Sequence, residues 1–114
     1  MSKEQTEVDW SKAPAICTIN GSRWLLGPET EEEMTWEGAI LWCHSKGGVL
    51  PPRDVLLHAY LNEDTKKKFT ATGYWSSTEL SATNAWYQDF GHGGQYNDTK
   101  ISAVYARAVK KLTI

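Results

Sequence analysis

The sequence has few cysteines, no long apolar run and no excess of basic residues, and each shortage excludes a class of protein. Two cysteines in 114 residues, Cys17 and Cys43, are too few for a disulfide scaffold. No run of about 18 apolar residues is present, so we expect no transmembrane helix, and the polar start argues against a secretory signal. Twelve Lys and Arg against fourteen Asp and Glu give a net charge of -2, which offers no basic footprint for nucleic acid.

The chain is rich in large aromatic residues, with six Trp and five Tyr. Its length suits one domain. A domain of this size has a small core, so bulky buried rings matter, since each removes about 150–250 Å² from water. Residues 1–13 are polar and precede Pro14, which predicts a flexible N-terminal leader, and residues 14–114 are predicted to form a single domain.

The first structured signal is a hairpin. Asn20-Gly21 separates two β-prone runs, and a type I′ turn needs positive φ at both central positions. Gly27-Pro28 is expected to end the second strand. Residues 29–33 (ETEEE) form an acidic run, which we interpret as a solvated loop leading into a helix, with a docking patch for a basic partner as the alternative.

Two helices are predicted next. Thr35 is a typical N-cap for a helix over residues 36–45, and Gly47-Gly48 suits its end. Pro51-Pro52 is typical of the first turn of a second helix, which Asn62 is expected to close, and residues 62–73 are expected to be a surface loop. Apolar residues at helical spacing define the buried stripes: Trp36, Ala39, Ile40 and Cys43 on the first helix, and Val55, Leu56, Ala59 and Tyr60 on the second.

The last third of the chain is predicted to be β structure. Strands are expected over residues 74–78, 85–90 and 101–110, with a flexible turn at residues 91–94. Trp86 and Phe90 are predicted to share one face, with Tyr87 and Asp89 on the other. The order of hairpin, two helices and several antiparallel strands predicts an α+β domain.

Five segments together have a recognisable order. They are residues 34–43 (MTWEGAILWC), 48–56 (GVLPPRDVL), 74–79 (YWSSTE), 85–87 (AWY) and 105–110 (YARAVK). In this order the chain resembles the Lcl C-terminal-type domain, a bacterial and phage family related to the C-type lectin-like fold, over residues 16–111. The resemblance implies a small twisted antiparallel sheet with two flanking helices and long loops.

One departure from the family concerns its cysteines. The family often ends in Arg-Cys-Val-Arg, and that cysteine is expected to bridge to one on the first helix. Here Cys43 matches the helix position, but Ala108 stands where the partner belongs. A missing bridge suggests a reducing compartment, so we expect a cytoplasmic protein, in the host cytoplasm if it is phage-encoded, with an extracellular or virion surface as the alternative. A direct bridge between Cys17 and Cys43 stays open.

The motifs of several chemistries are missing. Calcium-dependent lectins use Glu-Pro-Asn, Gln-Pro-Asp and Trp-Asn-Asp motifs, and the nearest segment here is Tyr96-Asn97-Asp98, which also suits a turn. No Cys and His spacing fits zinc. Formylglycine-generating oxidases have a related fold and a late pair of cysteines that Cys17 and Cys43 do not match. We therefore expect no metal, no cofactor and no enzymatic activity, with an oxidase of this kind as the last alternative.

What remains is a binding surface on the outer strand and loop of the C-terminal third. That segment is a mixture of Gly, Tyr, Asn and His, as in adaptable binding loops, and Tyr87 and Tyr96 are candidate anchors. Trp75 and Trp86 are assigned to the core. We expect a non-catalytic interaction module that binds a protein, plausibly of a bacterial host, with a glycan- or receptor-binding domain of an adhesin or tail fibre as the alternative, and neither nucleic acid nor membrane as partner. The candidate contact residues are Asn84, Tyr87, Asp89, His92, Gln95, Tyr96, Asn97, Asp98 and Lys100.

Overall fold

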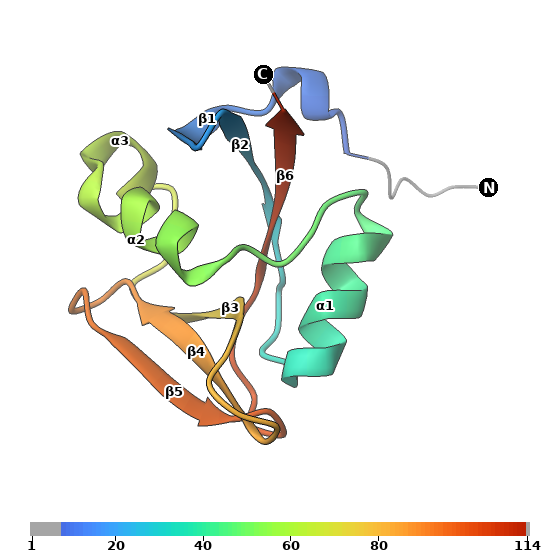
Figure 1. The fold of residues 1–114 in the computed structure, drawn as a ribbon, viewed down its shortest axis with the longest axis vertical. Coiled ribbons are helices and arrows are strands. Elements are labelled where there is room, and N and C mark those ends of the chain that lie inside the picture. Colours follow the sequence, from blue (N-terminus) through green and yellow to red (C-terminus); the bar gives the residue numbers. More distant parts are fainter. Residues whose placement is uncertain (1–7, 114) are drawn as a thin grey trace.

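The structure is a computed structural model that describes residues 8–113. It has an α+β architecture with two three-stranded antiparallel sheets (Figure 1). The first sheet has the order β1-β2-β6, from β1 (Ala15–Ile19), β2 (Ser22–Glu29) and β6 (Arg107–Thr113). The second strand and the last strand of the described chain therefore lie side by side in this sheet, with Ser22 opposite Thr113.

The second sheet has the order β3-β4-β5, from β3 (Gly73–Glu79), β4 (Asn84–Asp89) and β5 (Gln95–Thr99). The two sheets meet where Tyr74 of β3 forms a parallel bridge with Tyr105, just ahead of β6. β5 is an outer strand of this sheet (Figure 1).

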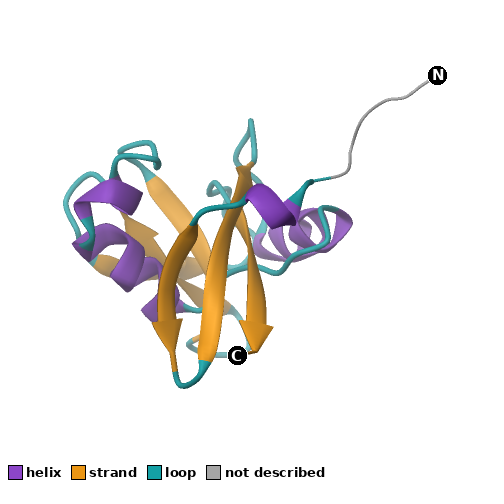
Figure 2. Ribbon diagram, turned by 90° about the horizontal axis from the view of Figure 1, so that it is seen from above, coloured by secondary structure: helices purple, strands orange, loops and turns teal. Residues whose placement is uncertain are grey.

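The helices flank the strands on opposite sides of the molecule (Figures 1 and 2). One side holds α1 (Trp36–Ser45), and the other holds α2 (Arg53–Leu61) and α3 (Glu63–Lys66). Thr35 caps α1 as predicted, because its hydroxyl accepts a hydrogen bond from the Gly38 amide.

The buried residues form two clusters. The first lies under α2 and includes Trp24, Leu56, Phe69, Tyr74 and Val109. The second lies under α1 and includes Ala39, Cys43, Trp75, Ala106 and Ala108. The small side chains of Ala106 and Ala108 allow α1 to approach closely, and β6 contributes residues to both clusters.

The predicted hairpin is confirmed, but its second strand is longer than predicted. Asn20 and Gly21 both have positive φ, as a type I′ turn requires. β2 continues through Gly27-Pro28 to Glu29, with a register shift between Leu26 and Glu29 that accommodates the proline. The prediction that Gly27-Pro28 ends the strand was therefore wrong.

The expected leader is also shorter than predicted. Trp10–Lys12 form a 3-10 helix, and the Trp10 ring lies over Gly27 and Gly48, where a Cβ atom would overlap it. Trp10 packs against the second cluster and covers backbone there. Residues 1–7 of the expected leader lie outside the described residues.

Three further boundaries differ from the predictions. Residues 62–73 are not only a loop, because the Asn62 side chain caps α3 and Thr65 is buried. The last strand begins at Arg107 rather than residue 101. Residues 95–99, for which no strand was predicted, form the strand β5, which pairs with β4. Their side chains are mostly polar, so the sequence shows no apolar alternation there.

Candidate binding face on the second sheet

Three aromatic rings form a row across the second sheet. Trp75, Tyr87 and Tyr96 lie opposite one another on three neighbouring strands, so their side chains share one face. The ring centroids are 6.4 Å apart for Trp75–Tyr87 and 5.9 Å for Tyr87–Tyr96. Trp75 is fully buried, Tyr87 is half-buried and Tyr96 is 49% exposed, so the row runs from the core to the surface.

Two carboxylates border this row. Burial raises the pKa of Tyr87, and the negative charges of Asp98 and Asp89 raise it further. The Asp98 Oδ1 atom accepts hydrogen bonds from the Thr99 amide at 2.7 Å and the Ser102 hydroxyl at 2.9 Å. Among the described residues Asp98 forms no ion pair.

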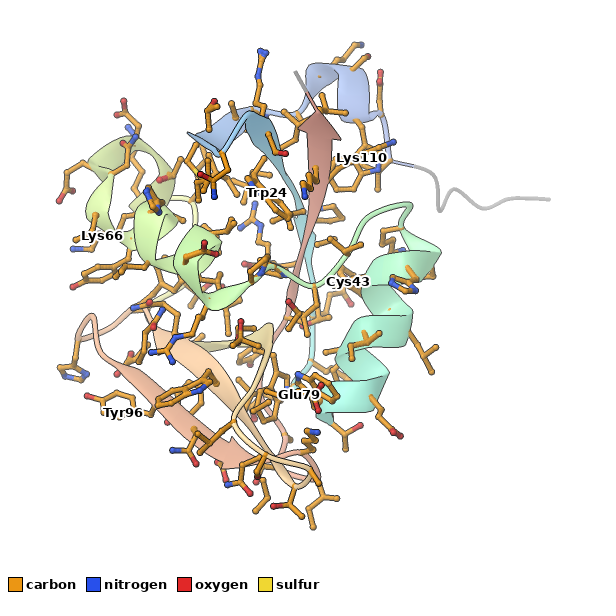
Figure 3. All side chains as sticks on the ribbon, viewed as in Figure 1. Trp24, Cys43, Lys66, Glu79, Tyr96 and Lys110 are labelled. Carbon is orange, nitrogen blue, oxygen red and sulfur yellow. The ribbon has the colours of Figure 1, made fainter. Side chains whose placement is uncertain are left out.

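Asp89 is held at the turn that joins β4 to β5. Its Oδ1 accepts the Gly91 amide at 2.7 Å, and its Oδ2 lies 3.2 Å from Nδ1 of the exposed His92. Burial opposes ionisation of Asp89, but the Gly91 amide and His92 outweigh it, so the pKa of Asp89 is lowered. We call Tyr87, Asp89, Tyr96 and Asp98 the tyrosine–aspartate face (Figure 3 labels Tyr96).

Three other candidate residues lie on the opposite face. The Gln95 side chain is held by three hydrogen bonds within the domain. Its amide nitrogen donates to the Gln88 side chain at 2.9 Å and to the Arg53 carbonyl at 2.8 Å, and its side-chain oxygen accepts from Arg53 Nε at 2.8 Å. Asn84 donates to Asn97 at 3.1 Å across the same strands. The candidate contact residues therefore come from two faces of the hairpin.

Trp86 differs from its predicted place in the core. It is half-buried and outside both clusters, with the Arg53 guanidinium 3.9 Å from its ring centre. It shares its face with the buried Gln88 rather than with Tyr87, as strand alternation requires. Phe90, which was predicted to share that face, follows the end of β4 and packs in the first cluster.

Lys100 lies at the far end of β5, away from the tyrosines. Its ammonium group pairs with Glu79 at 2.6 Å, donates to the Ala82 carbonyl at 3.0 Å and sits 4.5 Å from the Trp36 ring centre. Its side chain is only 17% exposed. These contacts fasten the end of the hairpin to α1, so Lys100 has an intramolecular role.

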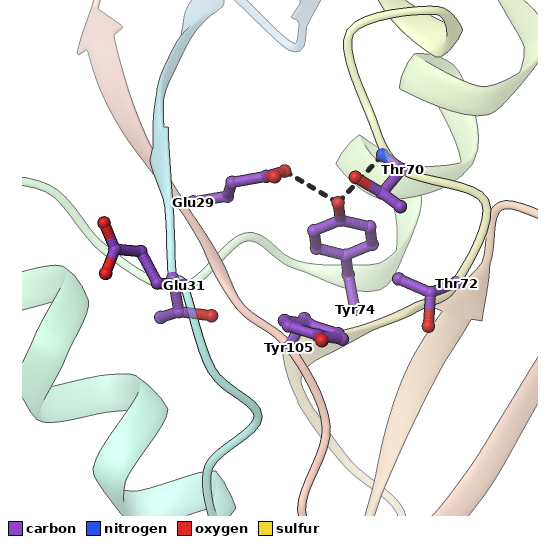
Figure 4. Close-up of a pocket in the computed structure, with 7 residues that line it drawn as sticks. Glu29, Glu31, Thr70, Thr72, Tyr74 and Tyr105 are labelled. Atoms are coloured by element: carbon purple, nitrogen blue, oxygen red, sulfur yellow. Dashed lines mark hydrogen bonds between the residues drawn. The ribbon is translucent and has the colours of Figure 1, made fainter.

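A cavity of about 340 Å³ lies where the two sheets meet, and no sequence motif indicated it (Figure 4). The Tyr74 hydroxyl donates to Glu29 at 2.7 Å and accepts the Thr70 amide at 3.0 Å. The Arg107 guanidinium also contacts Glu29, at 3.2 Å. The alternating pattern of the strand could have indicated that Tyr74 is buried. Glu29 could not be found in this way, because it belongs to the acidic run that we interpreted as solvated. Only residues 31–33 of that run are exposed.

The residues that could support other chemistries lie apart. Cys17 and Cys43 are free thiols that border or belong to different clusters, so they do not form a bridge with each other. Within residues 8–113, no three His, Cys, Asp or Glu side chains gather in a way that could hold a metal ion. No described helix is long and apolar enough to cross a membrane.

No family model matches the chain, and no curated protein matches it at a significant level. The site is therefore interpreted from its own geometry.

Proposed function

We propose that this chain is a non-catalytic interaction module that binds a protein through the tyrosine–aspartate face. The observation that carries the proposal is the row of rings from Trp75 to Tyr96. The half-exposed Tyr96 ring packs against Tyr87, which in turn packs against the core ring of Trp75, so Tyr96 loses little side-chain entropy on binding. Tyrosine is also a common anchor of interfaces.

The fold that we propose is the C-type lectin-like fold of the Lcl C-terminal-type domain. Two helices that flank small antiparallel sheets support it. The burial of Cys43 and Ala108 in one cluster also supports it, since the resemblance implies a bridge between these two positions. An Ala108→Cys variant is expected to form that bridge under oxidising conditions, and failure to oxidise without loss of folding would contradict the resemblance.

We further propose a phage-encoded protein that acts in the bacterial cytoplasm on a host protein. The free, buried thiol of Cys43 is consistent with a reducing compartment. The second candidate is glycan or receptor binding outside the cell. It is favoured by the mixture of tyrosine hydroxyls and carboxylates on one face, which can bond to sugar hydroxyls.

The experiment is an affinity capture from bacterial lysate with the tagged chain, read by mass spectrometry. Tyr96→Ala is the informative variant because the ring is exposed, and Leu61→Ala is its matched control, since Leu61 is 70% exposed on α2. Loss of one dominant partner with Tyr96→Ala alone supports the proposal. Capture that both variants leave unchanged moves the interface elsewhere, and glycan-array binding without any protein capture favours the second candidate.

A further inference from the structure

The outer edge of β5 has backbone groups that pair with no other group in residues 8–113. The Asp89 amide bonds to the Gly94 carbonyl and the Lys100 amide to the Thr83 carbonyl, which fixes the hydrogen-bonding alternation of the β4–β5 ladder. In an antiparallel ladder the intervening residues direct N–H and C=O outward. Gln95 and Asn97 therefore present both groups at the edge, and neither has a partner among the described residues.

The other sheet edges are covered or interrupted. β3 is covered, because the Trp75 amide donates to Tyr105 and the Ser77 amide to Pro51. β1 has a register shift at its start and packs against α2. β6 bonds to Val49 and has lysines at residues 110 and 111. Natural proteins use such features to prevent unwanted strand pairing.

β5 lacks these protections. Its sequence, QYNDT, has no proline and no lysine, and its pairing with β4 runs from Gln95 to Thr99 without a register shift. Among the described residues that face outward from β5, only Thr99 has partners for its backbone groups. Its amide donates to Asp98, and its carbonyl accepts from Ser102. A regular, uncovered edge of this kind is a template for an added strand.

We propose that the β5 edge accepts an extended segment of a protein partner as a fourth strand, with a basic side chain of that segment beside Asp98. This inference rests on the proposed function and deepens it by naming how the partner binds. The added strand would bond to Gln95 and Asn97. Its side chains on the tyrosine–aspartate face would lie beside Tyr96 and Asp98, whose carboxylate forms no ion pair among the described residues. A segment with an apolar residue two positions from Arg or Lys is therefore complementary.

The test uses the full chain and a synthetic peptide, acetyl-Thr-Arg-Thr-Val-Thr-Arg-amide, followed by NMR. The amides of Gln95 and Asn97 are expected to exchange with solvent about tenfold more slowly at a peptide concentration ten times Kd. The amides of Tyr96 and Asp98 already bond to β4, so their exchange is expected to change less. The peptide with Glu in place of Arg is expected to bind at least tenfold more weakly.

Two variants separate backbone pairing from side-chain contact. Asn97→Pro removes an outward N–H without removing a bond to β4, and it is expected to abolish peptide binding. Asn97→Ala removes the same side chain, including its bond to Asn84, but keeps the N–H, and it is expected to bind within twofold of the original chain.

Three outcomes would overturn strand addition. They are no binding of the Arg peptide, binding with unchanged exchange at Gln95 and Asn97, and protection that depends on protein rather than peptide concentration, which would assign the edge to a second copy. The proposed function fails separately. If lysate capture is lost with Tyr96→Ala but kept with Asn97→Pro, the face binds a protein and the strand inference is wrong.

Discussion

The indole nitrogen of Trp10 donates a hydrogen bond to the Lys46 carbonyl at 2.9 Å, joining residues 36 positions apart. The contact lies where α1 has just ended, and Lys46 is the C-cap of that helix. Helix ends leave carbonyl groups without partners, so Trp10 satisfies one of them while its ring covers Gly48. A segment that precedes the first strand is thereby part of the packed domain.

We predict that Trp10→Ala destabilises the domain. The variant loses a half-buried ring and the bond to Lys46, for which we expect about 2–3 kcal/mol, below the value for a fully buried ring. Urea denaturation followed by circular dichroism measures the change. Lys12→Ala is the control, since Lys12 is exposed in the same short helix. Equal stability of both variants would contradict the structural role of Trp10.

The two tyrosines of the binding face are expected to separate in their effect on stability. Tyr87→Ala removes a ring that packs against Trp75, so a loss of about 2 kcal/mol is expected. Tyr96→Ala removes a surface ring and is expected to stay within about 0.5 kcal/mol. Thermal denaturation of both variants tests this. A large loss for Tyr96→Ala would mean that its effect on binding reports unfolding instead.

Most of the fold follows from local patterns in the sequence. Thr35, Asn20-Gly21 and the stripe containing Ala39 and Cys43 each act through neighbouring residues, so their effects are visible in sequence. The strand β5 was not predicted, because Gln, Asn and Asp side chains form no apolar alternation and its strand conformation depends on pairing with β4.

The candidate site was predicted only in part for a similar reason. Tyr87, Asp89, Tyr96 and Asp98 do lie together, because residues opposite one another across a hairpin share a face. Gln95 and Lys100 were grouped with them from composition alone. Their partners, Arg53 and Glu79, are distant in sequence, and only the folded chain shows that both side chains are already engaged.

The thiol of Cys43 is predicted to be unreactive in the folded chain. Burial raises its pKa to about 12, and its side chain has no exposed surface, so the reactive thiolate is scarce and inaccessible. In a Cys17→Ser variant, labelling by a disulfide reagent at pH 8 is expected to occur only at the rate of unfolding and to accelerate with urea. Rapid labelling without urea would contradict the packing of α1 on β6.

Asp89 is predicted to titrate below its ordinary range because of the Gly91 amide and His92. A carboxyl whose pKa is lowered by folding stabilises the fold above its unfolded pKa of about 3.9, and this stability is lost as the pH falls through the folded value. NMR titration of the carboxyl carbon is expected to give a pKa below 3.8 and a higher value in His92→Ala.

His58→Ala is the control for that titration. His58 is exposed on α2, where its ring lies 2.8 Å from the Asp54 carbonyl rather than near Asp89. The same Asp89 pKa in the original chain and in both histidine variants would leave the backbone amides of Gly91 and His92 as the cause and exclude the His92 ring.

The position of β6 determines when the buried core can be completed during synthesis of the chain. This strand is the last part of the described chain to be synthesised, yet it contributes to both buried clusters. Val109 belongs to the first cluster, and Ala108 belongs to the second, together with Ala106, which directly precedes β6. A nascent chain that stops before residue 106 can form its hairpins and helices but lacks residues of both clusters. Both parts of the core are therefore completed together, once β6 has been synthesised, rather than one after the other.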